Sequence, residues 1–244
     1  MLRLNQRYLF LASFLLVVIT ISPGCDPTDA PNDVKSSKDG GLLDENPDSG
    51  LVQRDDHTIS LFDGQSLAGW EVTNFGGEGE CHAADGVLTI EMGYPLSGVT
   101  SDLTDLPKGN YEISLDAKRV DGIDFFCGLT FPVNESHCTL IVGGWAGTVV
   151  GLSCIDGQDA ARNETRTVRK FELDRWYAIK VQFVDDRIRC WIDDEKLIDI
   201  SIAGREISVR AETLITRPLG ICTFETTAAF RNIELRKLSS SKNE

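Results

Sequence analysis

The sequence predicts an all-β protein, folded as a two-sheet jelly-roll sandwich in a single domain. Three observations predict it: short runs alternate apolar and polar residues over positions 57–238, Gly- and Asp-rich turns separate these runs, and no stretch keeps a helical apolar period over three turns. About a dozen short strands of this kind are typical of sandwiches and jelly rolls. The chain has no internal repeat with a period of about 20–50 residues, which argues against a propeller or a solenoid.

The segment before position 57 is expected to lie outside the fold. Basic residues precede a short apolar run that ends at Ile21, and small residues follow, which is the pattern of a secretory signal over residues 1–24. A small residue followed by Cys25 resembles a bacterial lipoprotein box, in which Cys25 would carry a lipid and anchor the protein to a membrane. Plain secretion is the alternative. Residues 25–56 then form the anchor cysteine and a flexible acidic tether rich in Pro, Gly, Ser and Asp.

Within the domain, the clearest strands alternate between apolar and polar side chains. The run 111–118 places Tyr, Ile, Leu and Ala against Glu, Ser, Asp and Lys, and the runs 177–183 and 187–193 do the same. The Asp185-Asp186 pair between the last two runs predicts a tight hairpin turn.

Other segments are less regular. The fuller apolar runs 123–131 and 138–142 predict central strands, since strands buried on both faces lose the alternation. The mixed region 203–217 is expected to hold a loop or a short helix, and residues 239–244 a frayed tail.

The charge of the chain argues against nucleic-acid binding. It has 24 basic and 38 acidic residues and a net charge of -14, whereas a phosphate backbone attracts a basic surface. The 41% hydrophobic content excludes disorder of the whole chain. The expected location is the periplasm or the cell surface.

The cysteines and histidines do not predict a metal centre. With Cys25 lipidated, six of the seven cysteines remain, and they are either disulfide-bonded or small buried side chains. No CxxC motif occurs, and the three histidines lack the spacing of zinc ligands. No cofactor is therefore expected, although the Asp-rich loops leave a structural calcium site open. The motifs GxSxG, the P-loop and a GxGxxG that opens a helix are also missing.

The order of short motifs along the domain carries a resemblance. The domain opens with the sequence SLFDGQSLAGW over residues 60–70, continues with Gly109-Asn110-Tyr111 and Arg175-Trp176-Tyr177, and closes with AFRNIEL over residues 229–235. This order resembles the 3-keto-disaccharide hydrolase domain family, formerly a domain of unknown function. Within the resemblance, the chain is similar to a divergent lipoprotein member of the planctomycete type. The resemblance implies a concanavalin A-like or laminin G-like jelly roll that hydrolyses glycosyl bonds of 3-keto-disaccharides or related glycosides.

Two departures from the family pattern concern the site. The family often has a Gly-Asn-Ser-Gly-Ile stretch that leads to an Arg on the central strand, but residues 122–131 read GIDFFCGLTF. The Asn-Gly hairpin turn of the family is Asp193-Asp194 here. The resemblance therefore implies the fold and the class of chemistry, whereas the site residues must be sought in this chain.

The segment 121–169 supplies the residue types that sugar chemistry uses. Cleavage of a glycosidic bond needs a carboxylic acid and a second group that activates water or stabilises charge, and binding needs an aromatic face and amides. The candidate acid/base groups are Asp124, His137, Asp156 and Glu164. The candidate substrate-binding residues are Trp145, Gln158, Asp159 and Trp191.

Each candidate also has a structural interpretation. Asp156 and Asp159 are typical turn residues, and His137 lies beside a turn where surface histidines are common. A lone acid in the apolar run around Asp124 is costly to bury unpaired, so it is either exposed or paired. Glycines on both sides leave the Trp145 ring open for stacking, whereas Trp191 either stacks on a ligand or packs against the fold.

Three functions fit the sequence. An exported enzyme that acts on carbohydrate requires two titratable groups that converge in one pocket. A carbohydrate-binding module requires aromatic side chains without such a pair. An adhesion lipoprotein requires a broad patch and no pocket.

Overall fold

A computed structural model describes residues 58–239 of the chain. The signal sequence, the lipidation of Cys25 and the tether, which were predicted for residues 1–56, lie outside the described residues.

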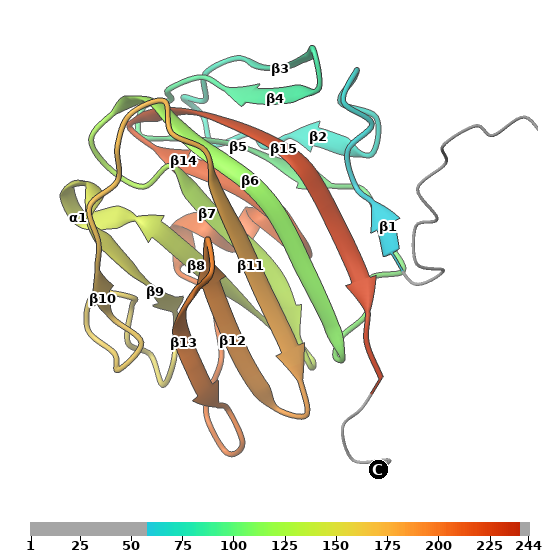
Figure 1. The fold of residues 1–244 in the computed structure, drawn as a ribbon, viewed down its shortest axis with the longest axis vertical. Coiled ribbons are helices and arrows are strands. Elements are labelled where there is room, and N and C mark those ends of the chain that lie inside the picture. The colour runs from blue at the N-terminus through green and yellow to red at the C-terminus, as the bar shows by residue number, and fades with distance from the viewer. Residues whose placement is uncertain (1–57, 240–244) are drawn as a thin grey trace, which may run out of the picture. The chain divides into compact units, whose positions relative to one another are not determined.

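Two antiparallel sheets pack face to face as a jelly-roll sandwich (Figure 1), which confirms the predicted fold class. One sheet, here sheet A, is ordered β13 (Glu195–Ser201), β12 (Arg187–Ile192), β11 (Tyr177–Val184), β6 (Tyr111–Gly122), β15 (Thr226–Lys237), β4 (Val87–Ile90) and β3 (Cys81–Ala84), with β1 (Thr58–Ser60) also paired to β15. Sheet B is ordered β10 (Thr167–Val168), β9 (Val149–Ser153), β8 (Ser136–Gly143), β7 (Cys127–Val133), β14 (Gly220–Phe224), β5 (Leu96–Ser101) and β2 (Trp70–Val72).

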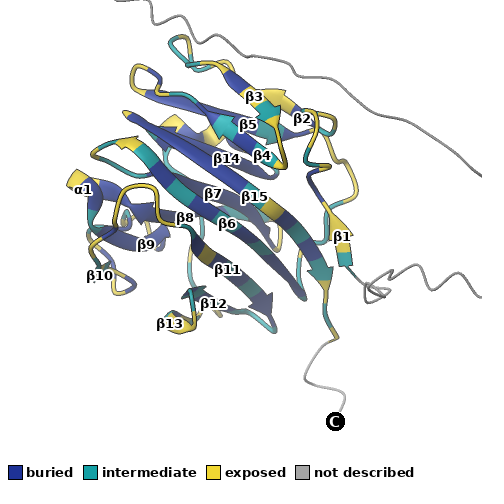
Figure 2. Ribbon diagram, turned by 45° about the horizontal axis from the view of Figure 1, so that its top comes forward, coloured by how far each residue is buried: buried dark blue, intermediate teal, exposed yellow. Residues whose placement is uncertain are grey.

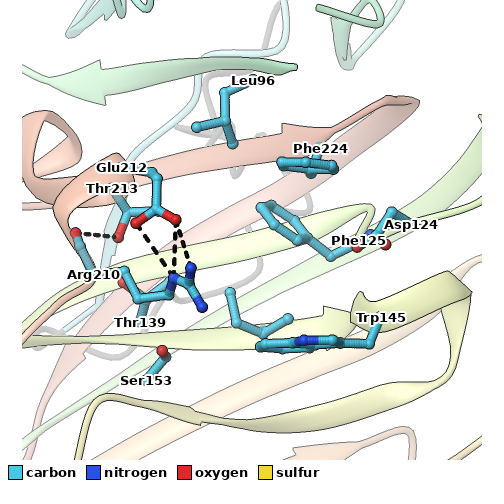
Figure 3. Close-up of a pocket in the computed structure, with 11 residues that line it drawn as sticks. Leu96, Asp124, Phe125, Thr139, Trp145, Ser153, Arg210, Glu212, Thr213 and Phe224 are labelled. Carbon is cyan, nitrogen blue, oxygen red and sulfur yellow. Dashed lines mark hydrogen bonds and ion pairs between the residues drawn. The ribbon is translucent and has the colours of Figure 1, made fainter. Parts of the chain in front are cut away.

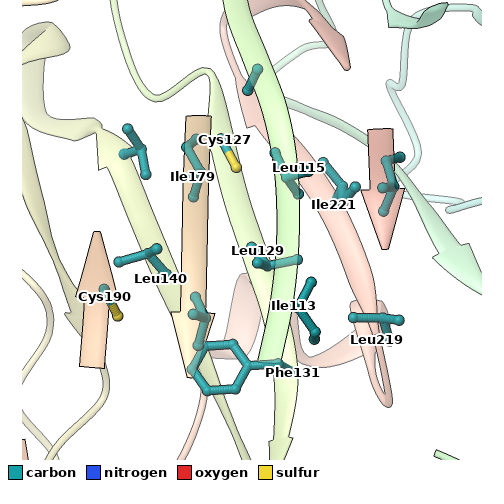
Figure 4. Close-up of a cluster of buried hydrophobic side chains, with 14 of the residues drawn as sticks. Ile113, Leu115, Cys127, Leu129, Phe131, Leu140, Ile179, Cys190, Leu219 and Ile221 are labelled. Carbon is teal, nitrogen blue, oxygen red and sulfur yellow. The ribbon is translucent and has the colours of Figure 1, made fainter. Parts of the chain in front are cut away.

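The core lies between the two sheets and is formed by every second residue of the long strands (Figure 4). On β6 the inward side chains include Ile113 and Leu115, and on β7 they include Leu129 and Phe131. These side chains are almost fully buried. In sheet A, Figure 2 shows buried and more exposed positions alternating along β6 and β11, and this period of two separates the core face from the outer face. The central strands of sheet B, such as β7, are buried on both faces, which fits the fuller apolar runs of the sequence.

The β11–β12 hairpin confirms the predicted turn. Asp185 and Asp186 have φ values of 50° and 57°. Two successive residues with positive φ are typical of the type I′ turn, whose twist matches that of the flanking strands.

The prediction of one strand over 123–131 is wrong in its first part. Strand β7 begins only at Cys127, and the preceding residues form a bend. The N–H of Phe125 bonds to the Asp124 carboxylate instead of to a neighbouring strand, whereas the N–H of Phe126 still donates to Val142. The mixed region 203–217 contains a short 3₁₀ helix, η1 (Ala211–Thr216).

The six cysteines of the described residues are all buried and unpaired. Within residues 58–239 no three His, Cys, Asp or Glu side chains gather as metal ligands would. No helix in this part of the chain is long and apolar enough to cross a membrane.

Candidate functional site

A pocket of about 240 Å³ lies on the outer face of sheet B (Figure 3). Side chains from four of its strands line this pocket, together with residues of η1 and of the segments before β7 and after β8. The lining residues are Leu96, Asp124, Phe125, Thr139, Ile141, Trp145, Ser153, Arg210, Glu212, Thr213 and Phe224.

The pleat of the strands explains why these residues face outward. On β8, Cys138, Leu140 and Val142 belong to the core between the sheets. Successive side chains of a strand point to opposite faces. Thr139 and Ile141 therefore face the pocket.

The lining divides into two ends. The aromatic end consists of Phe125, Trp145 and Phe224, and the polar end consists of Thr139, Ser153, Arg210, Glu212 and Thr213. Figure 3 shows the two ends on opposite sides of the pocket. At the aromatic end, the rings of Phe125 and Phe224 have centroids 5.8 Å apart and an interplanar angle of 41°.

Trp145 is carried by a tight turn, α1 (Gly144–Gly147), that follows β8. Trp145 and Ala146 have φ values of 48° and 61°, in the left-handed region that side chains disfavour. The Trp145 side chain is 39% exposed. The turn thus holds a large ring partly open to solvent at the edge of the pocket.

Asp124 holds this turn in place. One carboxylate oxygen accepts a hydrogen bond from the backbone N–H of Ala146 at 3.0 Å, and the other accepts one from the N–H of Phe125 at 2.8 Å. Each oxygen keeps a second lone pair that can accept a bond from a ligand.

The glycine that ends the turn is required by close packing. Gly147 has a φ of 84°, and a Cβ atom at this position would lie 2.7 Å from the Arg119 guanidinium and 2.9 Å from the carbonyl oxygen of Ile123. Glycine is therefore the residue that fits both the backbone conformation and the space.

At the polar end, Arg210 and Glu212 form an ion pair with a shortest distance of 2.6 Å. The hydrogen bonds from Arg210 hold the pKa of Glu212 below its usual value, so the carboxylate is ionised at neutral pH. Arg210 also contacts Asp159 at 3.2 Å. Two carboxylates therefore neutralise the guanidinium that lines the pocket.

A chain of threonine hydroxyls lies behind the polar end. Thr216 donates to the carbonyl oxygen of Thr213 at 2.7 Å, and Thr130 lies 2.8 Å from Thr216 and 2.9 Å from Thr139. A carbonyl can only accept, so the single hydroxyl hydrogen of Thr216 is committed to it. Thr130 must then donate to Thr216, and Thr139 must donate to Thr130. The hydroxyl hydrogen of Thr139 is therefore committed to Thr130, and Thr139 is itself only 1% exposed.

Of the residues named from the sequence, the structure brings Asp124 and Trp145 together in this pocket. Asp159 contacts Arg210 but does not itself line the pocket. Gln158 is exposed in the turn that follows β9.

Asp156 and Glu164 lie elsewhere, on either side of Arg205. Their distances to the Arg205 guanidinium are 2.6 and 2.7 Å. The pKa of Asp156 is lowered by the backbone N–H of Glu206 and by Arg205, and the pKa of Glu164 by Arg205. This cluster forms an exposed ion-pair network outside the pocket lining.

The last two candidates lie on different sheets. His137 is on β8, on the same face as Thr139, and burial and the nearby Arg217 lower its pKa. Trp191 is on β12, on the outer face of sheet A, where the ammonium group of Lys180 lies 4.5 Å from its ring centroid. The structure does not place either side chain in the pocket lining.

Arg210 and Glu212, which come from the mixed region 203–217, were not predicted from the sequence. Neither was Phe224, at the end of β14. For the residues on β8, strand alternation was the available signal. Thr139 is a polar residue between apolar neighbours, so its outward direction could have been inferred from the sequence.

A family model, described as the 3-keto-alpha-glucoside-1,2-lyase-like domain, matches residues 57–236. The chain belongs to this family. The resemblance seen in the opening and closing motifs is thereby confirmed, since the match covers nearly the whole described part of the chain. No curated protein matches the sequence.

Solved structures similar to this 3-keto-alpha-glucoside-1,2-lyase-like domain have low sequence identity to it. A putative glycosyl hydrolase from Parabacteroides distasonis is 16% identical over 75% of this chain and 95% of its own, with a TM-score of 0.47. The carbohydrate-binding module CBM66 from Bacillus subtilis is 16% identical over 69% of this chain and 96% of its own, with a TM-score of 0.45. The Crh5 transglycosylase in complex with NAG is 10% identical over 75% of this chain and 85% of its own, with a TM-score of 0.50.

Proposed function

We propose that the pocket on sheet B is the site of a carbohydrate-acting, glycoside hydrolase-like enzyme that cleaves the glycosyl bond of 3-keto-glycosides. The family to which the chain belongs supports the class of substrate. The observation that carries the proposal is the joint presence of an open aromatic platform, Trp145, and two carboxylates, Asp124 and Glu212, in one pocket.

The chemistry of a 3-keto sugar gives a role to the polar end. The hydrogen on C2 is acidic because the carbanion it leaves is conjugated with the C3 carbonyl. A base that takes this proton lets the C1–C2 double bond form while the C1–O bond breaks, and the leaving oxygen takes up a proton. Addition of water to the double bond then gives 3-keto-glucose.

Glu212 is our candidate for the base. Its pairing with Arg210 keeps it ionised, and an ionised carboxylate is needed to accept a proton. Arg210 is the candidate for stabilising the negative charge on the C3 oxygen as the proton leaves. Trp145, whose ring is partly open at the edge of the pocket, would stack on a C–H face of the sugar ring, and Asp124 would accept a hydrogen bond from a hydroxyl at that edge. In this proposal Asp124 remains an acid/base candidate, as the sequence suggested.

The test is release of 3-keto-glucose from 3-keto-trehalose or 3-keto-lactose by the purified protein and by Glu212→Gln. Gln keeps the shape and an acceptor oxygen for Arg210 but does not take the proton. The expected result is turnover by the wild type and a loss of at least about 100-fold in Glu212→Gln, the order that removal of a general base costs. Glu206→Gln, an exposed neighbour outside the pocket, is the matched control. Equal rates for the two variants would contradict the assignment of Glu212.

A carbohydrate-binding module is the second candidate function. The observation in its favour is that both pocket carboxylates already have partners, Asp124 two backbone N–H groups and Glu212 the Arg210 guanidinium. Binding of 3-keto-trehalose in calorimetry without any turnover would favour this function over the enzyme. Export to the periplasm or cell surface, and a lipid at Cys25, remain proposals that mass spectrometry of the protein from its native membrane would test.

A further inference from the structure

The aromatic end of the pocket carries more apolar side chains than a single stacking platform for a sugar ring. A pyranose carries hydroxyl groups around its edge, and only its C–H faces stack on an aromatic ring. Trp145 alone supplies such a platform. Phe125 and Phe224, which Figure 3 shows next to each other on the side away from Arg210 and Glu212, add apolar surface, and Leu96 and Ile141 also belong to the lining.

The polar end has the opposite character. Glu212 offers carboxylate oxygens that accept hydrogen bonds. Sugar hydroxyls can donate to such acceptors, so this end suits the glycone. As long as Glu212 is ionised, Glu212 and Asp159 neutralise the charge on Arg210, so a ligand that is anionic before any reaction would gain little there.

We infer that the ligand is a glycoside with an aromatic aglycone, its sugar at the polar end and its aglycone on the Phe125–Phe224 wall. The inference rests on the proposed function and narrows its substrate class from 3-keto-glycosides in general to those with an aryl aglycone. One end of the pocket offers hydrogen-bond acceptors and the other end is apolar. An aryl glycoside has a hydroxyl-bearing half and an apolar half that fit these two ends.

The test compares three probes that lack the ketone and are therefore not cleaved: methyl α-D-glucopyranoside, phenyl α-D-glucopyranoside and trehalose. Their dissociation constants for the full-length protein are measured by calorimetry. The phenyl glucoside is expected to bind at least about tenfold more tightly than the other two, because burial of a phenyl ring corresponds to that factor or more.

Two variants separate the ends of the pocket. Phe224→Ala is expected to remove the preference for the phenyl glucoside and to leave the methyl glucoside within about twofold. Glu212→Gln, which removes the charge of the acceptor at the polar end and keeps the shape, is expected to weaken both glucosides by the same factor. Phe75→Ala, a half-buried phenylalanine outside the pocket lining, is the control for a general loss of fold.

The outcomes distinguish this inference from the proposed function. If trehalose or the methyl glucoside binds as tightly as the phenyl glucoside, or if Phe224→Ala weakens all three probes equally, the wall stacks on sugar and the inference is overturned. Turnover of 3-keto-trehalose would leave the proposed function standing in that case. Absence of both turnover and binding would overturn the two together.

Discussion

Asp124→Ala is expected to release the turn that carries Trp145. The substitution removes the acceptor of two backbone N–H groups, those of Ala146 and Phe125, at 3.0 and 2.8 Å. A hydrogen bond to a charged group contributes roughly 1.5–3 kcal/mol. Asp124 is only half-buried, so the low end applies and the two bonds sum to about 3 kcal/mol.

The left-handed conformations of Trp145 and Ala146 disfavour the turn, because each costs about 1 kcal/mol or more of conformational free energy. Loss of about 3 kcal/mol therefore lowers the ratio of ordered to disordered turn by roughly 100-fold, since each 1.4 kcal/mol is a factor of ten. The effect is local, because the turn lies at the edge of sheet B. Sugar affinity is expected to fall with the ordered population of Trp145.

The assay is the emission of Trp145, obtained as the difference between each protein and its Trp145→Phe counterpart, together with calorimetric binding of methyl α-D-glucopyranoside. Asp124→Asn keeps one acceptor oxygen and is expected to be intermediate. Asp121→Ala is the matched control, because its carboxylate bonds only to the neighbouring Gly122 N–H at the same strand end. If Asp124→Ala and Asp121→Ala give the same emission and the same affinity, the reasoning is refuted.

Three further predictions concern packing, pH and thiols. Gly147→Ala is expected to destabilise the protein by about 1–3 kcal/mol in urea unfolding, because its Cβ would overlap Arg119; Gly157→Ala, at a φ of 72° with open space around it, is the control, and equal midpoints would contradict the packing argument. The pKa of Glu212 is lowered from 4.5, so its ion pair stabilises the fold above that pH, and the stabilisation is lost as pH falls through the lower folded-state pKa. Ligand affinity measured against pH should therefore fall only below pH 4.5, and this fall should differ in Glu212→Gln. Burial raises the pKa of Cys81 to about 11, and those of Cys138 and Cys222 to about 12; iodoacetamide at pH 7 should label these thiols only after unfolding, and rapid labelling of the native protein would be inconsistent with their burial.

Much of the fold was predictable because strand alternation and turn residues act locally. The run 111–118 and the Asp185-Asp186 turn follow from a period of two and from residues that tolerate positive φ. The exception at 123–126 also involves a local contact. Apolar composition alone does not reveal that the N–H of Phe125 bonds to the Asp124 carboxylate instead of to a neighbouring strand.

The site was only partly predictable because it joins segments far apart in the chain. Asp124 and Trp145 were identified since each is unusual in its local sequence, an acid in an apolar run and a Trp between glycines. Arg210 and Glu212 carry no such signal, as an ion pair between close neighbours is common on surfaces. Only the position of η1 over sheet B brings them to the pocket, and that depends on the tertiary fold.

Retention of a deuterium label tests the proposed elimination most directly. 3-Keto-trehalose carrying deuterium at C2 of the oxidised ring is converted by the protein, and the released 3-keto-glucose is analysed by mass spectrometry. Labelled 3-keto-glucose in protein-free buffer measures background exchange. If Glu212 removes the C2 proton, the product has lost its label, and Glu212→Gln forms little product. Product that keeps the label, or a Glu212→Gln variant as fast as the wild type, would contradict the account.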